Sequence, residues 1–215
     1  MEKGWIDYLV PQVYWSMDLP VASHSKIVDW WSKNSKNTNL YIGNGPYKIR
    51  NNSDKAWNKK RELPNQLKLA RNYNNVTGNV FFSAKSLMTN KEDVLRILKK
   101  KYYQNIALPP SSPLQQNTFE NNTIPFKFEK NDEALQFSII ADNINELRYA
   151  LIYASKKESK LNLDTPLQLL AKIPVPNSGN FNVNSSLLKG KKYMALTFIN
   201  RFGQESKPQI IKIDR

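Results

Sequence analysis

The side chains best suited to chemistry in this sequence follow three predicted strands in its first half. They are amides, phenols, an indole, a hydroxyl and an ammonium group: Gln12, Tyr14 and Trp15 after the first strand, Asn44 and Tyr47 after the second, and Ser83 and Lys85 after the third. Amides and hydroxyls exchange hydrogen bonds with ligand hydroxyls, and aromatic rings offer flat apolar faces for stacking. This combination is typical of a site for sugars.

Two interpretations of these residues stay open. Alternation along a strand puts Gln12 and Tyr14 on one face and Asp7 on the other. Ligands of parallel α/β folds bind at the carboxyl ends of the strands, so this position favours a ligand site. Tyr14 and Trp15 are equally compatible with packing at the end of a strand, which makes Gln12 the stronger candidate.

Groups for catalysis and metal binding are scarce. The sequence has no cysteine and one histidine, His24, which we expect at the surface in the first turn of a helix. Glycoside hydrolysis usually needs two carboxylates beside the scissile bond, but no Asp or Glu stands at the three predicted strand ends. The sequence therefore predicts no metal site, no cofactor and no complete hydrolytic pair, and it leaves the catalytic residues unknown.

The positive charge of the chain is large but dispersed along the sequence. A net charge of +14 divides into +10 over residues 1–117 and +4 over residues 118–215. Nucleic-acid-binding proteins gather such charge on one face, so we expect no nucleic-acid partner. No run of 18 apolar residues predicts a membrane span, and the first residues lack the pattern of a secretory signal.

The first half of the chain alternates between strand and helix patterns. Strands are predicted at 5–15, 39–44 and 78–84, and helices at 23–34, 62–74 and 90–103. Such alternation implies parallel strands joined by crossover helices. Because three such units cannot close a barrel, we expect the chain to be part of something larger.

The pattern changes after residue 110. The run ALPPSSPLQQNTFENN holds three prolines and many polar residues, and residues 111–118 within it are interpreted as a linker. Six or seven short β-rich runs follow within residues 119–215, separated by turn-forming residues. This spacing predicts an antiparallel β-sandwich. The predicted fold class is therefore α/β plus all-β, with domains at 1–110 and 119–215.

Several runs of the first half occur in the order found in a known family. The runs WIDYLVPQVYW, IVDWW, LYIGNGPYKI, LPNQLKLAR, VTGNVFFSAKSL and YYQNIALPP resemble the carboxyl-terminal half of the glycosyl-hydrolase-like DUF187 (GHL10) proteins over residues 4–110. The resemblance implies the last three βα units of a TIM-type (β/α)8 barrel, followed by a domain similar to fibronectin type III or immunoglobulin domains. It also implies a cell-envelope lipoprotein or a secreted protein.

The resemblance assigns the three strands as the sixth to the eighth of the barrel. It implies that Gln12 and Tyr14 line the cleft from the sixth strand, that Tyr47 follows the seventh, and that Ser83 and Lys85 follow the eighth. The family's acidic motif, His-Phe-Asp-Asp-Tyr, belongs to an earlier strand and has no counterpart here. The resemblance thus implies a polysaccharide or oligosaccharide partner for a chain without the family's catalytic carboxylates.

Other functions are compatible with the same sequence. The β-sandwich could be an adhesion or spacer module, so that the chain is a non-catalytic binding or scaffolding protein of the cell envelope. A third option is salt-sensitive binding of nucleic acid or anionic envelope polymers to the basic surface. The end strands of an incomplete barrel also leave backbone groups unpaired, which predicts self-association or marginal stability of residues 1–110.

Overall fold

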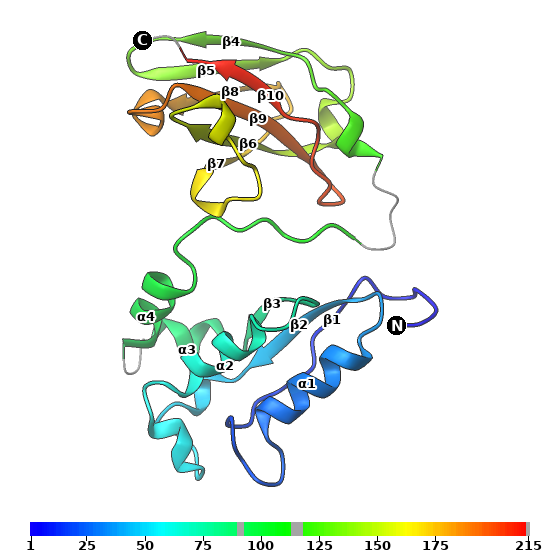
Figure 1. Ribbon diagram of the computed structural model, residues 1–215, viewed down its shortest axis with the longest axis vertical. Coiled ribbons are helices and arrows are strands. Elements are labelled where there is room, and N and C mark those ends of the chain that lie inside the picture. The colour runs from blue at the N-terminus through cyan, green and yellow to red at the C-terminus, as the bar shows by residue number, and fades with distance from the viewer. Residues whose placement is uncertain (90–92, 113–117, 214–215) are drawn as a thin grey trace. The chain divides into compact units, whose positions relative to one another are not determined.

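The computed structural model describes residues 1–89, 93–112 and 118–213 (Figure 1). The chain forms two compact units, Met1–Gln104 and Asn105–Arg215. The second unit begins before the predicted linker because the preceding segment packs on it: Leu108 joins an apolar cluster of that unit, and the Ser112 N–H donates to the Phe202 carbonyl. Residues 113–117 of the predicted linker and residues 90–92 of the predicted third helix lie outside the described residues.

The first unit contains a three-stranded parallel sheet in the order β1-β2-β3. Its strands are β1 (Tyr8–Leu9), β2 (Asn39–Asn44) and β3 (Val76–Phe81), and its helices are α1 (His24–Asn34), α2 (Glu62–Ala70), α3 (Ala84–Met88) and α4 (Val94–Lys101). The parallel pairing agrees with the predicted alternation of strands and helices. No described helix is long and apolar enough to cross a lipid bilayer.

Helices α1 and α2 cover one face of this sheet (Figure 1). Val28 of α1 and Ala70 of α2 share a buried apolar cluster with Leu40 of β2. The residues that alternate with this buried set point to the other face. That face is open to solvent, since Tyr8 is 62% exposed and Val80 is 44% exposed.

The bounds of two strands differ from the sequence prediction. The first strand, predicted over 5–15, is reduced to β1 because Pro11 has no N–H for the sheet ladder. Pairing resumes after it as a single parallel bridge between Gln12 and Gly43. Ser83, predicted inside the third strand, is instead the N-cap of α3, a helix that the pattern did not predict.

The second unit consists of two antiparallel sheets, β4-β5-β8 and β10-β9-β6-β7. Its strands are β4 (Phe126–Lys130), β5 (Ala134–Ile139), β6 (Leu147–Ser155), β7 (Leu169–Pro174), β8 (Asn180–Asn184), β9 (Tyr193–Asn200) and β10 (Gln209–Lys212). Phe137 of the first sheet and Phe198 of the second are buried in the same core. The two sheets therefore enclose one core, as the short alternating runs predict.

Candidate functional site

The carboxyl ends of β1, β2 and β3 lie at one edge of the sheet because the three strands are parallel. Backbone hydrogen bonds continue beyond the strands at this edge. The Val13 N–H donates to the Gly43 carbonyl, and the Phe82 N–H donates to the Asn44 carbonyl, both at 3.0 Å. The three segments that follow the strands are therefore held side by side.

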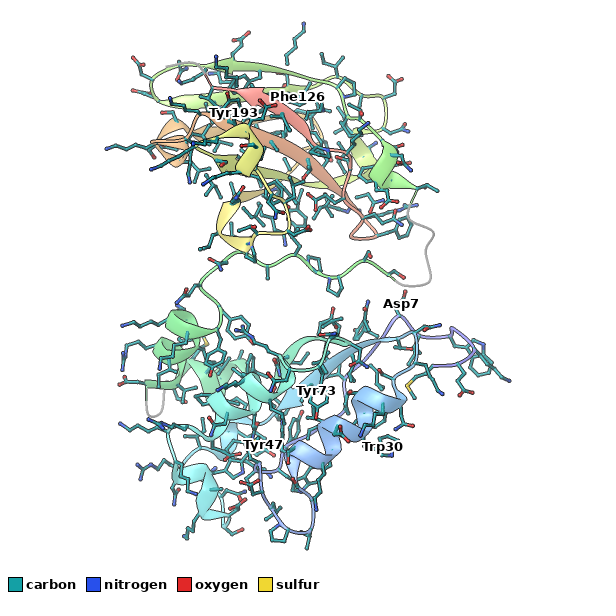
Figure 2. All side chains as sticks on the ribbon, in the orientation of Figure 1. Asp7, Trp30, Tyr47, Tyr73, Phe126 and Tyr193 are labelled. Carbon is teal, nitrogen blue, oxygen red and sulfur yellow. The ribbon has the colours of Figure 1, made fainter. Side chains whose placement is uncertain are left out.

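Three aromatic rings, those of Tyr14, Tyr47 and Phe82, meet at this edge, and we call them the aromatic trio. The Tyr14 ring centroid lies 5.9 Å from that of Tyr47 and 6.1 Å from that of Phe82, and the last two are 6.0 Å apart. Rings at these separations attract one another. Tyr47 (labelled in Figure 2) is 37% exposed and Phe82 is 60% exposed. The trio is thus a preformed apolar surface that a ligand can reach from solvent.

Two glycines leave room for this arrangement. A Cβ on Gly45 would lie 3.1 Å from the Tyr47 ring and 3.3 Å from the Cβ of Tyr14. A Cβ on Gly43 would lie 2.7 Å from the carbonyl oxygen of Pro11. Glycine at these positions allows the backbone after β1 to approach β2 and allows the two tyrosines to meet.

Three more of the predicted site residues follow the same strands and are accessible to solvent. Gln12 and Lys85 are exposed, and Trp15 is 39% exposed. Lys85 and Tyr47 together line a cavity of about 200 Å³. Burial, and then the neighbouring Tyr47, raises the pKa of Tyr14, so its phenol keeps its proton at neutral pH. The segments that follow the three strands therefore carry phenols, an amide and an ammonium group, which supply the hydrogen-bonding chemistry of a sugar site.

The other two predicted site residues are held within the fold. Asn44 is fully buried: its Nδ2 donates to Gln66 Oε1 at 3.0 Å, and its Oδ1 accepts from Asn79 Nδ2 at 2.7 Å. Ser83 begins α3, and its backbone N–H donates to Ser86 Oγ at 3.5 Å. Asn44 therefore positions the end of β2, from which the loop to Tyr47 departs.

Asn44 belongs to a buried polar network that joins α2 to the strand ends. Gln66 donates from Nε2 to the Trp15 carbonyl at 3.1 Å and to Glu62 Oε1 at 2.9 Å. The same Glu62 oxygen accepts the Met17 N–H at 2.7 Å. Glu62 is 6% exposed, and its carboxylate satisfies buried donors of the scaffold. This network fixes the segment after β1 against the helix.

A second carboxylate near this edge is that of Asp54. It accepts hydrogen bonds from Ser16 Oγ at 2.5 Å and from the Ala56 N–H at 2.9 Å. The bond from Ser16 is the largest cause that lowers the pKa of Asp54 below its usual value. A carboxylate held in the ionised form does not suit the general acid of glycoside hydrolysis. Among the described residues, no group of three or more His, Cys, Asp and Glu side chains could hold a metal ion.

The sequence predicts His24 at the surface, and this prediction is wrong. The side chain is 0% exposed, and its Nδ1 lies 3.0 Å from the Val13 carbonyl oxygen. A carbonyl can only accept, so Nδ1 carries the proton, and Nε2 has no hydrogen-bond partner among the described residues. Burial lowers the pKa of His24 to about 4, although the Val13 and Trp15 carbonyls act in the opposite direction. The first turn of α1 faces the sheet, and its short polar sequence gives no sign of this.

Sequence reasoning also missed Phe82, which completes the aromatic trio. The residue follows Phe81 at the end of the third strand, and an aromatic pair at that place was a usable signal. The contacts of Glu62, Gln66 and Asp54 with residues 15–17 carried no such signal, because they join residues 38 to 51 positions apart in the chain.

The chain is similar to named glycosyl hydrolases. Residues 1–59 match the sequence model of the family described as glycosyl hydrolase-like 10. Glycosyl hydrolase YngK of Bacillus subtilis (strain 168) is 34% identical over 169 residues, which cover 76% of this chain and 33% of YngK. Glycosyl hydrolase DigH of Escherichia coli (strain K12) is 37% identical over 51 residues, 23% of this chain and 12% of DigH. The chain therefore spans a third or less of the length of these relatives.

One solved structure also resembles the chain. It is the crystal structure of the spore cortex lytic enzyme SleM of Clostridium perfringens, with a TM-score of 0.31 and 10% identity over 97% of this chain and 68% of that one. A likeness at this TM-score supports no statement about fold or function. The family match and the identity to YngK confirm the resemblance found in the sequence. Residues 1–59 of the chain are therefore similar to the glycosyl hydrolase-like 10 family.

Proposed function

We propose that this chain is the C-terminal part of a glycoside hydrolase-like protein and that the aromatic trio is one wall of its glycan cleft. The observation that carries the proposal is the meeting of Tyr14, Tyr47 and Phe82 at the carboxyl edge of a parallel sheet. Sugar rings stack their C–H faces on such surfaces, while Gln12 and Lys85 can bond their hydroxyls. The similarity to two proteins named glycosyl hydrolases supports a glycan as the ligand.

We further propose that the three strands are the last three of a (β/α)8 barrel. Two observations support this: the described helices that pack on the sheet cover one of its faces, and the other face, with Tyr8 and Val80, is the one that a barrel would enclose. In this chain β1 and β3 are edge strands, and edges recruit partners. We expect the chain to self-associate through them, and sedimentation that shows a compact monomer at high concentration would contradict this expectation.

For the 215-residue chain itself we propose glycan binding without hydrolysis. Glu62 and Asp54 approach the strand ends, but both carboxylates accept hydrogen bonds from the scaffold. The acid and base of the parent protein would then come from other parts of its barrel. Release of reducing ends from a panel of polysaccharides tests this directly. Measured turnover by this chain would overturn the proposal.

The second unit is proposed to be a fibronectin type III or immunoglobulin-like domain. Seven antiparallel strands in sheets of three and four, β4-β5-β8 and β10-β9-β6-β7, support this class. A non-catalytic adhesion or spacer role is the second candidate function of the chain, and the separate core of this unit favours it. Hydrogen exchange of backbone amides, measured with and without a glycan, tests this candidate. Slower exchange in the second unit, with unchanged exchange at the aromatic trio, would favour it.

The experiment that tests the glycan site is calorimetric titration of the chain with cello-, chito- and xylo-oligosaccharides. Tyr47→Ala and Phe82→Ala should each raise the Kd about tenfold, which is a loss of about 1.4 kcal/mol. Gln12→Ala should weaken binding less. Trp30→Ala is the matched control, because it removes a ring that is 54% exposed on α1. Binding that is unchanged in the Tyr47 and Phe82 variants would contradict the site.

A location for the parent protein in the cell envelope or outside the cell is proposed from the family resemblance. An antibody raised against this chain should then detect the parent in envelope or culture-medium fractions. Detection in the cytoplasmic fraction alone would contradict the proposal.

A further inference from the structure

Positive charge is concentrated at one end of the second unit. Six lysines and three acidic residues line two adjoining cavities there, a local net charge of +3. We call the six lysines the lysine cluster: Lys130, Lys156, Lys157, Lys189, Lys191 and Lys192. Residues 105–215 carry 14 basic and 10 acidic residues, a net charge of +4. Three quarters of this excess therefore lies around the two cavities.

The antiparallel topology explains why lysines from distant segments meet. Strands β4 and β6 end at this side of the unit, where β9 begins. The Lys192 N–H donates to the Ser155 carbonyl at 3.0 Å and so joins the start of β9 to the end of β6. The Ser185 N–H donates to the Glu133 carbonyl, also at 3.0 Å, and joins the end of β8 to the turn after β4.

Backbone hydrogen bonds fix the loop that carries three of these lysines. The short helix Ser185–Leu188 begins at Asn184, whose Oδ1 accepts the Ser186 N–H at 2.9 Å. The N–H groups of Lys189 and Lys191 donate to the Ser186 and Leu188 carbonyls at 3.1 and 2.9 Å. Because the loop is already ordered, a ligand need order only the lysine side chains, which lowers the cost of binding.

The two cavities form one continuous basic surface. Their volumes are about 700 and 640 Å³, and Lys192 lines both. Lys130, Lys189 and Lys191 line the larger cavity, and Lys156 and Lys157 line the smaller one beside Tyr193 (labelled in Figure 2). A chain-like ligand that lies across Lys192 can therefore contact lysines of both cavities, whereas a small anion can contact only a few of them.

We propose that the lysine cluster binds a flexible acidic polymer that carries repeated phosphate or carboxylate groups. The ammonium group of lysine is a point charge that accepts either anion without a fixed planar geometry. The cavity linings contain no arginine and one aromatic residue, Tyr193. Proteins that bind single-stranded nucleic acid stack successive bases on several rings, so the cluster favours a polymer without bases.

The test compares two variants of the full chain that have the same net charge. The cluster variant is Lys189→Gln with Lys191→Gln and Lys192→Gln. The control is Lys99→Gln with Lys100→Gln and Lys101→Gln, which removes three charges from the last turn of α4 in the first unit. Binding of labelled polyphosphate and labelled poly-L-glutamate is measured by fluorescence anisotropy over a range of salt concentrations.

We expect log Kd of the unmodified chain to rise linearly with log salt concentration, because binding releases the counterions of the polymer. In the cluster variant the slope of log Kd against log salt concentration should be smaller by about three, roughly one for each lysine. This variant should also bind at least about tenfold more weakly at low salt. The control should keep most of its slope and affinity. Preference for polyphosphate or for poly-L-glutamate supports the proposal in either case and distinguishes phosphate from carboxylate as the anion.

Three results would overturn the proposal. Equal losses in the two variants would show that affinity follows net charge and not the cluster. A flat salt dependence would show that ionic contacts do not drive binding. Tighter binding of single-stranded DNA than of either probe would assign the surface to nucleic acid. If the triple variant melts earlier than the control, Lys189→Gln alone, at an exposed position, should still reduce the slope by about one.

Discussion

Acid should destabilise the first unit through one buried side chain, His24. Its Nδ1 donates to the Val13 carbonyl at 3.0 Å, and its Nε2 has no hydrogen-bond partner among the described residues. A proton added to Nε2 would place a positive charge inside the core. For this reason burial lowers the pKa of the imidazole from 6.5 to about 4.

The size of the effect follows from the two pKa values. The unfolded chain takes up the proton near pH 6.5 and the folded chain only near pH 4, so the unfolded state holds more protons between these values. Stability therefore rises with pH in this window. Each pKa unit corresponds to about 1.36 kcal/mol in the free energy of unfolding. Neutral His24 therefore contributes about 3 kcal/mol to the stability of the first unit above pH 6.5, and this contribution is lost as the pH falls to about 4.

Tryptophan fluorescence during urea unfolding can follow this loss. All five tryptophans, Trp5, Trp15, Trp30, Trp31 and Trp57, lie in the first unit and none in the second, so the signal reports the first unit alone. His24→Asn is the matched variant, because its side-chain amide can donate to Val13 in place of Nδ1 but does not titrate. We expect the unmodified chain to lose about 3 kcal/mol between neutral pH and pH 4, and the variant to lose much less.

Equal losses in the two proteins would refute this reasoning, because another group would then be responsible. A loss that begins only below pH 3.8 would also refute it. A loss of stability in that pH range would instead come from Asp54, whose pKa is lowered from 3.8 chiefly by the hydrogen bond from Ser16. The stability that ionised Asp54 contributes is therefore lost only at more acid pH.

Three further predictions concern the scaffold of the strand ends. Gly43→Ala should destabilise the first unit by about 1–3 kcal/mol, because its Cβ would lie 2.7 Å from the Pro11 carbonyl oxygen. Gly78→Ala, whose Cβ meets only the movable Tyr41 ring at 3.0 Å, is the control, and equal costs in urea unfolding would argue against the backbone clash. Gln66→Leu should cost about 1–3 kcal/mol, since Asn44 and the Trp15 carbonyl lose their partner; an unchanged urea midpoint would mean that the network does not hold the strand ends. Ser16→Ala should raise the pKa of Asp54 toward its usual value, because the largest cause of its lowering is removed. Carboxyl NMR titration measures this pKa, and the same value in both proteins would contradict the assigned cause.

The sequence by itself determined the order of the elements of the first unit and the place of several candidate site residues at the strand ends. The helix pattern in HSKIVDWW and the strand pattern in NLYIGN depend on the local spacing of apolar residues. This spacing is the same in any fold that buries one face of each element. Because the crossovers make the strands parallel, Tyr14 and Tyr47 were expected at one edge, and they meet there. The ordered runs of the first half were also enough to indicate the glycosyl hydrolase-like 10 family, whose sequence model matches residues 1–59.

Only the tertiary structure decided which of these groups are available and which hold the scaffold. Asn44 and Gln12 have similar chemistry and both stand near strand ends, yet one is buried against α2 and the other is exposed. His24 is buried because the first turn of its helix packs on the sheet. The Glu62 carboxylate accepts a hydrogen bond from the backbone N–H of Met17, 45 positions earlier in the chain. The six lysines of the lysine cluster are scattered from 130 to 192 in the sequence, and only antiparallel pairing gathers them at one end of the second unit. Local periodicity carries no information about such distant pairings, because they depend on which faces of the packed elements meet.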